Sequence, residues 1–382
     1  SKLIQLINGM QEIKLNNYER QKRWEWERIQ ARLFKVNIQS LSLQQYQQAG
    51  SVFINETKNI VITILAATAV VNGQMSLGMM LAVQYIIGQM NSPLEQMVEF
   101  MQVSQDAKIS LERLSEIHTQ KDEEQDQAGK LTSLPSKADI AVSGLVFQYE
   151  GPNSPKVLNN INLTIPQGKV TAIVGTSGSG KTTLVKLMLG FYPPVAGSVK
   201  VGESDVSLFK QQWWREQCGA VMQDGFIFSD TIANNIALPE DEVDKERLAY
   251  AVRLANIQEY IESLPLNYNT KIGPEGVGLS QGQKQRILIA RAIYKNPEFI
   301  FFDEATNALD ANNEKVILEN LNEFFKGKTV VVVAHRLSTV KNAHQIAVLE
   351  KGELVELGTH EELTAKQGAY YNLVKNQLEL GN

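Results

Sequence analysis

Cysteine is almost absent from this chain, and so is any excess of positive charge. Cys218 is the single cysteine in 382 residues, so no intrachain disulfide framework can form, and the composition fits a reducing compartment. The formal net charge at pH 7 is −5. Because no basic patch dominates, we expect no nucleic acid partner. The length predicts two or three domain-sized units.

Long unbroken apolar runs are also scarce. Two runs, residues 60–71 and 77–87, are separated by a polar turn at 72–76. A membrane helix needs about 20 predominantly apolar residues, and the first run meets Asn59 and Lys58 when it is extended backwards. Hydropathy therefore predicts a helical hairpin, and it leaves open whether the hairpin spans a membrane or is buried in protein. Polar groups on one side could face a water-filled cavity between helices.

The first 48 residues are polar, rich in glutamine and nearly free of glycine and proline. Apolar residues at helical spacing predict a basic helix there. A solvated helix face and a cytoplasmic stalk beside a membrane, on the positive-inside rule, both explain it. Residues 94–118 again have a helical pattern. The chain opens on Ser1 with neither an initiator Met nor a signal peptide, which suggests a fragment or a processed chain.

The composition changes after residue 118. Residues 119–137 are polar and acidic, as in a linker, and we place the domain boundary there. From residue 138 short apolar strands alternate with helices, which predicts a mostly parallel α/β core. Residues 225–270 are expected to form a helical insertion without such strands. A hairpin at 345–357 is expected before a C-terminal helix.

One short stretch organises this second part. Gly175-Thr176-Ser177-Gly178-Ser179-Gly180-Lys181-Thr182 fits G-x-x-x-x-G-K-[ST], the phosphate-cradling P-loop. Glycines let backbone N–H groups wrap a phosphate chain, and the helix that follows adds its N-terminal partial positive charge. Lys181 is suited to the β- and γ-phosphates and Thr182 to Mg²⁺. The alternative is a Gly/Ser-rich turn, but the full motif between a strand and a helix favours a nucleotide site.

Two carboxylates end a buried strand at residues 299–304. Asp303 is suited to hold Mg²⁺ through water, and Glu304 to polarise the water that attacks the γ-phosphate. The alternative is a strand that ends in an acidic helix cap. A P-loop in the same domain favours the catalytic interpretation.

Five further residues are candidates for the same site. Ser280 and Gln283 fit a capping box, and the exposed helix start that they cap could also be an anion site. His335 and Gln223 each follow a predicted strand, so both can lie beside the P-loop. Tyr149, at the end of the first strand, could stack on a base, although a buried strand aromatic explains it equally well.

Taken in order, these residues resemble a known family. The P-loop, Gln223, Leu279–Gln283, Asp303-Glu304, Asn307–Asp310 and His335 stand in the order seen in ATP-binding-cassette (ABC) transporters. Residues 138–382 closely resemble the cassette, an α/β P-loop NTPase with a helical subdomain. Residues 1–118 resemble the last two helices of an exporter-type, all-α transmembrane domain. Residues 221–232 look most like bacterial peptide and bacteriocin exporters.

The resemblance implies ATP and Mg²⁺ as ligands and assigns a role to each motif residue. The implied ATP-binding residues are Tyr149, Gly175, Thr176, Ser177, Gly178, Ser179, Gly180, Lys181, Thr182 and Thr183. Glu304, His335 and Gln223 are the implied catalytic residues, and Thr182, Gln223 and Asp303 (through water) the implied Mg²⁺ ligands. Ser280, Gln281, Gly282 and Gln283 would contact the γ-phosphate held by a partner subunit, and Asp310 would lie at the dimer contact.

A P-loop and a helix-terminus anion site in one domain cannot easily meet on one ATP. Two chains arranged head to tail would pair them twice. We therefore expect a homodimer. The resemblance further implies multi-pass subunits in the cell's inner membrane, in contact with lipid, with the ATPase domain in the cytoplasm and a peptide as cargo. A lipid or multidrug exporter would carry identical ATPase residues. A soluble ABC ATPase of DNA repair or the ribosome is disfavoured by the apolar hairpin and the lack of a basic patch.

Three positions depart from the family's pattern. Gln281 stands where Gly is usual, Asn307 where Ser is usual, and Pro274 where exporters usually have Glu. Glu304 and His335 are both present, which favours two working sites over one dead site.

Overall fold

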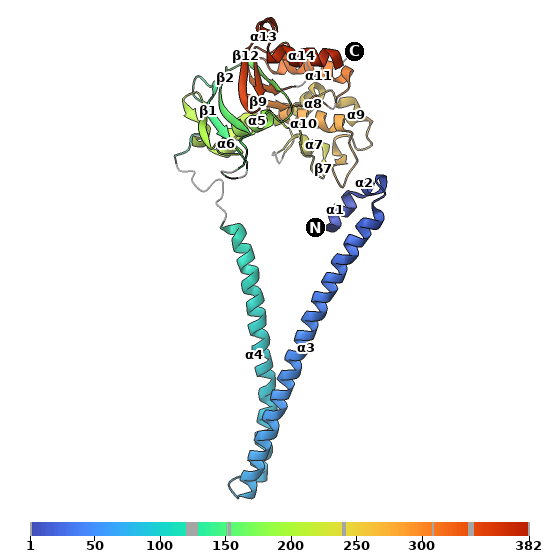
Figure 1. The fold of residues 1–382 in the computed structure, drawn as a ribbon, viewed down its shortest axis with the longest axis vertical. Coiled ribbons are helices and arrows are strands. Elements are labelled where there is room, and N and C mark those ends of the chain that lie inside the picture. Colours follow the sequence, from blue (N-terminus) through green and yellow to red (C-terminus); the bar gives the residue numbers. More distant parts are fainter. Residues whose placement is uncertain are drawn as a thin grey trace. The chain divides into compact units, whose positions relative to one another are not determined.

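A computed structural model describes residues 2–119, 129–149, 151, 154–238, 242–307, 309–334 and 340–380. The chain divides into two compact units, Ser1–Gln120 and Lys121–Asn382. Figure 1 shows the fold of each unit.

The N-terminal unit is entirely helical. Its helices are α1 (Lys2–Asn8), α2 (Met10–Leu15), α3 (Glu19–Val71) and α4 (Leu77–His118). Ser76 ends the turn between the two long helices, and its hydroxyl accepts a hydrogen bond from the Met79 backbone N–H at 3.3 Å. Near this turn Gln84 on α4 donates to Thr63 on α3 at 3.4 Å. The predicted hairpin is therefore a pair of long helices that contact each other beside the turn (Figure 1).

Helix α4 is longer than the pattern predicts. The two helical stretches predicted at 77–87 and 94–118 form one continuous helix that passes through Pro93. A proline inside a helix removes one backbone hydrogen bond and commonly bends the helix without ending it. The helix therefore continues through residues 88–93, which the sequence pattern left between the two predicted stretches.

The long helices expose their apolar side chains. Ala66 is the one buried hydrophobic residue described in α3, whereas Ile64 and Leu65 beside it are 59% and 64% exposed. Among the described residues α3 is the one helix long and apolar enough to cross a membrane, and the apolar stretch Leu77–Met90 of α4 is shorter. These surfaces need lipid or further helices to cover them.

The C-terminal unit is built on a six-stranded sheet in the order β12-β11-β3-β10-β9-β6. Its strands are β3 (Val170–Gly175), β6 (Cys218–Val221), β9 (Phe299–Asp303), β10 (Thr329–Val333), β11 (Gln345–Glu350) and β12 (Glu353–Gly358). All neighbours pair in parallel except β12, which forms the predicted hairpin with β11. In register, Val333 of β10 pairs with Ile173 of β3 and with Asp303 of β9. The P-loop and the two carboxylates therefore leave the sheet at the same edge.

Successive residues of the central strands face two different cores. Phe299 and Phe301 pack with helices α5 (Lys181–Met188) and α6 (Gln211–Gln217) and with a second, antiparallel sheet. Ile300 and Phe302 pack with the helices on the other face. The second sheet has the order β2-β1-β4-β5, with β1 (Ile140–Phe147), β2 (Leu158–Ile165), β4 (Ala196–Val201) and β5 (Ser204–Asp205). Burial on both faces explains why these strands are almost continuously apolar.

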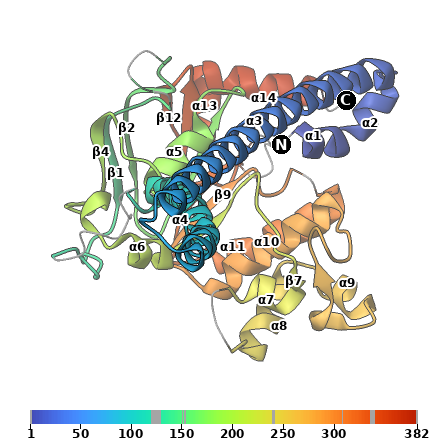
Figure 2. The same cartoon turned by 90° about the horizontal axis from the view of Figure 1, so that it is seen from below.

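The remaining helices fall in three places: the predicted insertion at 225–270, the segment between that insertion and β10, and the C-terminal end. They are α7 (Ile232–Ile236), α8 (Lys245–Leu254), α9 (Gln258–Ser263), α10 (Gln281–Lys295), α11 (Ala311–Phe324), α13 (His360–Lys366) and α14 (Ala369–Leu380). Figure 2 shows α7, α8 and α9 grouped on the side of the unit opposite β1, β2 and β4.

Two details differ from the prediction. A two-residue strand pair, β7 (Asp230–Thr231) with β8 (Lys271–Ile272), closes the base of the insertion. The C-terminal helix is two helices, because Gln367 takes a left-handed conformation and Glu356 accepts hydrogen bonds from the first N–H groups of α14.

Candidate nucleotide site

The P-loop, Gly175–Thr182, joins β3 to α5 in a conformation that requires glycine at two positions. Gly175 has φ +154°, and a Cβ atom there would collide with the carbonyl of Leu349. Gly180 has φ +96°, and its Cβ would lie 2.6 Å from the Leu158 side chain. The loop can therefore curl tightly in front of α5 only with these glycines. Its backbone N–H groups and the start of α5 make a surface suited to phosphate.

Lys181 lies inside this loop. Its side chain is buried, and Nζ donates hydrogen bonds to the carbonyls of Gly175 at 3.0 Å and Thr176 at 2.9 Å. Burial lowers the pKa of the ammonium group, and the negative charges of Glu304 and Asp303 partly offset this. The Lys181 ammonium group thus lies between the P-loop backbone and the carboxylates. In this position it could also bind phosphate oxygens by charge-assisted hydrogen bonds.

Asp303 is the fully buried carboxylate of the site, with no exposed surface. Burial raises its pKa, the charge of Glu304 raises it further, and Thr182, Lys181 and Lys186 partly oppose the shift. The Thr182 hydroxyl lies near enough to stabilise the carboxylate, yet neither oxygen of Asp303 has a hydrogen-bond partner among the described residues. Buried oxygens are normally satisfied. A buried carboxylate with unsatisfied oxygens, close to a threonine hydroxyl, fits a hard cation such as Mg²⁺.

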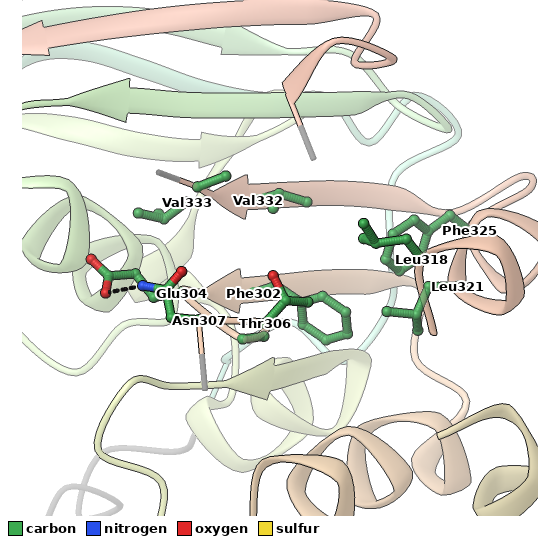
Figure 3. A pocket seen from close by; sticks show the side chains of 11 residues that line it. Phe302, Glu304, Thr306, Asn307, Leu318, Leu321, Phe325, Val332 and Val333 are labelled. Atoms are coloured by element: carbon green, nitrogen blue, oxygen red, sulfur yellow. Dashed lines mark hydrogen bonds between the residues drawn. The ribbon is translucent and has the colours of Figure 1, made fainter. Parts of the chain in front are cut away.

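Glu304 follows in a conformation that is rare outside glycine, with φ +54°. Its backbone N–H donates to the Val333 carbonyl at 3.0 Å, and its own carbonyl accepts from Gln285 at 2.9 Å. The Asn307 amide donates to carboxylate oxygen Oε2 at 2.7 Å. Figure 3 shows this pair at one end of a small cavity whose other end is closed by Leu321 and Phe325. The strained backbone is thus fixed from β10, α10 and the loop before α11.

Tyr149 lies next to the P-loop helix. Its hydroxyl is 2.9 Å from the Thr183 hydroxyl, and its ring meets the edges of Phe147 and Tyr192. The side chain is 47% exposed, so it is not the buried strand aromatic that the sequence left as an alternative. An exposed ring beside the phosphate loop is available for stacking.

The predicted capping box at the start of α10 is present. The Ser280 hydroxyl accepts from the Gln283 N–H at 3.2 Å, and the Gln283 side chain accepts from the Ser280 N–H at 2.8 Å. Ser280 and Gln281 are exposed, and Gly282 is half-buried. In the part of the chain that the structure describes, no hydrogen bond joins Ser280 to the P-loop. The start of α10 is thus capped and exposed.

The other predicted positions lie after β6, at the start of α11, or outside the residues that the structure describes. Gln223 is exposed two residues after β6, whose last residue, Val221, pairs with Phe302 of β9. Asp310 caps α11 and accepts from the Asn313 N–H at 2.9 Å and the Asn313 amide at 2.6 Å. His335 lies outside the described residues, and so does Ala308.

Two residues at the site were given no catalytic role by the sequence. Gln285 donates a hydrogen bond to the Glu304 carbonyl, and Asn307 donates one to the Glu304 carboxylate. The signal for Gln285 in the sequence is a polar residue among the apolar positions of α10. Asn307 carried a signal too, since it departs from the family's usual Ser.

Comparison with known proteins agrees with this geometry. The ABC transporter family matches residues 158–307. The Toxin RTX-I translocation ATP-binding protein of Actinobacillus pleuropneumoniae is 40% identical over 355 residues, which cover 93% of this chain and 50% of that protein. The leukotoxin translocation ATP-binding protein LktB of Mannheimia haemolytica is similar to the same extent. The chain thus spans about half the length of these relatives.

A solved structure shares the fold. A bacterial Atm1-family ABC exporter with ATP bound matches with a TM-score of 0.91 at 26% identity, over 98% of this chain and 66% of that one. Three findings point to the same kind of domain: the shared fold, the matched family and the glycine-dependent geometry of the P-loop. The chain therefore carries the ATP-binding domain of an ABC transporter.

Proposed function

We propose that this chain supplies ATP hydrolysis to an ABC exporter. The observation that carries the proposal is the convergence of the buried Lys181, the unsatisfied Asp303 and the strained Glu304 at one edge of the sheet. Positioning and charge stabilisation are what phosphoryl transfer requires of a protein. The similarity to translocation ATP-binding proteins and to an exporter structure supports the direction of transport.

In this proposal Glu304 polarises the attacking water, and His335 steadies the γ-phosphate. Thr182 and Gln223, with Asp303 through water, would hold Mg²⁺, which would neutralise charge that develops on the phosphates. Lys181 binds the β- and γ-phosphates once it leaves the two P-loop carbonyls that it contacts here. Tyr149 stacks on the adenine.

Two copies of the chain would assemble head to tail. The exposed Ser280 end of α10, with Gln281, Gly282 and Gln283, would contact the γ-phosphate held by the other copy, and Asp310 would lie at the contact between them. A helix of 15 residues with an exposed, capped start supports such a role. ATP would then hold the dimer together, and hydrolysis would release it.

The chain would be organised as a membrane part, residues 1–118, a linker, 119–137, and the cassette, 138–382. The exposed apolar surfaces of α3 and α4 support contact with lipid. The subunit would be a multi-pass protein of the inner membrane with its cassette in the cytoplasm. The names of the relatives favour a polypeptide as cargo.

The test is Glu304→Gln in the full-length protein in lipid. We expect ATP turnover to fall by about 100-fold or more while ATP binding is retained, because the base is lost and the phosphate contacts remain. Stimulation of the wild-type protein by a leader-bearing peptide, abolished by E304Q, would support polypeptide export. Wild-type turnover in E304Q would refute the role of Glu304, and stimulation by lipids or hydrophobic drugs alone would refute the cargo class.

A further inference from the structure

Asn307 contacts Glu304 twice. Its side-chain amide donates to carboxylate oxygen Oε2 at 2.7 Å, and its backbone N–H donates to the Glu304 carbonyl at 3.2 Å. The second bond closes a turn over residues 304–307, so the amide reaches the carboxylate from three positions ahead. A hydrogen bond of this length to a charged oxygen is among the stronger ones that a protein makes.

This bond is one contact that helps to set the direction of the Glu304 side chain. Behind it lies a cavity of about 20 Å³, lined mainly by apolar side chains such as Phe302, Leu321 and Phe325. Figure 3 shows the carboxylate turned away from Leu321 and Phe325, with the Asn307 amide beside it. A carboxylate that turned toward the apolar side would lose solvation. The hydrogen bond from the Asn307 side-chain amide opposes that movement.

We propose that Asn307 is a positioning residue, which holds the Glu304 carboxylate in the direction needed to polarise the attacking water. The inference rests on the proposed role of Glu304. An amide suits this task because it donates a hydrogen bond without carrying a charge and without competing for the proton. Gln285 fixes the Glu304 backbone from α10, so that backbone and carboxylate are held by separate amides.

The test is a double-mutant cycle in the full-length protein in lipid, with MgATP turnover as the readout. Asn307→Leu removes the donor at nearly constant size. We expect kcat to fall about 10-fold to 100-fold, the range for losing a hydrogen bond to a charged group, with KM for ATP within about two-fold. In the E304Q background the same substitution should leave the residual rate unchanged, because there is no carboxylate left to position.

Other outcomes separate the possible failures. A wild-type kcat in N307L, or an equal loss in both backgrounds, would overturn the positioning role. Wild-type turnover in E304Q alone would instead refute the proposed function. Asn322→Leu, on the exposed face of α11, is the matched control and should match wild type. If N307L fails to bind ATP, Asn307→Ser replaces it in the cycle: its shorter donor should lower kcat with Glu304 present and change nothing with E304Q.

Discussion

At the scale of single residues, the site keeps an energetically unfavourable group. Asp303 is fully buried and neither of its oxygens has a hydrogen-bond partner among the described residues. Thr182, Lys181 and Lys186 offset the effect of burial only in part, so the carboxylate costs stability unless a cation or a proton neutralises it. The proposed Mg²⁺ site would explain why the residue is there, since the amide of Asn would be the more stable choice without a metal.

We predict that Asp303→Asn stabilises the nucleotide-free protein and abolishes Mg²⁺-dependent turnover. The melting temperature at neutral pH should rise by roughly 2–4 °C for each kcal/mol gained. Differential scanning calorimetry in EDTA checks the first part, and an ATPase assay checks the second.

The pH dependence of this gain has a defined sign. Burial raises the pKa of Asp303 in the folded state, so between the unfolded and the folded pKa the native protein binds more protons than the unfolded chain. Stability then falls as pH rises through this window. The advantage of D303N should be largest above the folded pKa and should shrink in acid, where wild-type Asp303 is protonated. A constant or growing advantage in acid would contradict the assignment.

At the scale of elements, α10 combines two tasks in one side chain. The Ser280 hydroxyl caps the helix by accepting from Gln283, and it is exposed at the end proposed to meet the partner's phosphate. The two tasks respond differently to charge, because an N-cap accepts Asp as readily as Ser whereas a phosphate repels it.

Ser280→Ala and Ser280→Asp should therefore separate the two tasks. We predict that S280A lowers the free energy of unfolding by about 1 kcal/mol, as expected for a lost cap, whereas S280D does not. Both should impair ATP-dependent dimerisation, S280D more strongly, when measured by sedimentation in the E304Q background. Wild-type dimerisation by S280D would leave Ser280 as a cap and nothing more.

The elements also show what the sequence could predict. Strands β9 and β10, the P-loop with its flanks and the α10 cap were predictable, because each depends on a local pattern of burial, glycine or capping residues. The β7–β8 pair joins residues about 40 positions apart, and the contacts of Gln285 and Asn307 with Glu304 depend on the backbone conformation of Glu304. Such features follow from tertiary packing, which short-range periodicity does not contain.

At the scale of the whole molecule, the two units differ in what stabilises them. The C-terminal unit holds both large hydrophobic cores, one on each face of its six-stranded sheet. The long helices of the N-terminal unit bury few side chains of their own. The cassette has the packing of an independent domain, whereas α3 and α4 require an apolar environment or partner helices.

The head-to-tail dimer makes a prediction that only two chains can satisfy. Lys181→Ala removes the P-loop cation and S280D blocks the helix end, so each variant alone should be inactive. In a dimer with one copy of each, the intact P-loop of the S280D chain meets the intact Ser280 of the K181A chain. One complete site forms, and the purified heterodimer should recover about half of wild-type turnover. Differently tagged chains, co-expressed and purified in two steps, provide the sample.

The matched control pairs K181A with E304Q, where both sites carry a lesion and no activity should return. If the K181A–S280D dimer stays as inactive as its parents, the P-loop and Ser280 act within one chain, and the proposed arrangement is wrong.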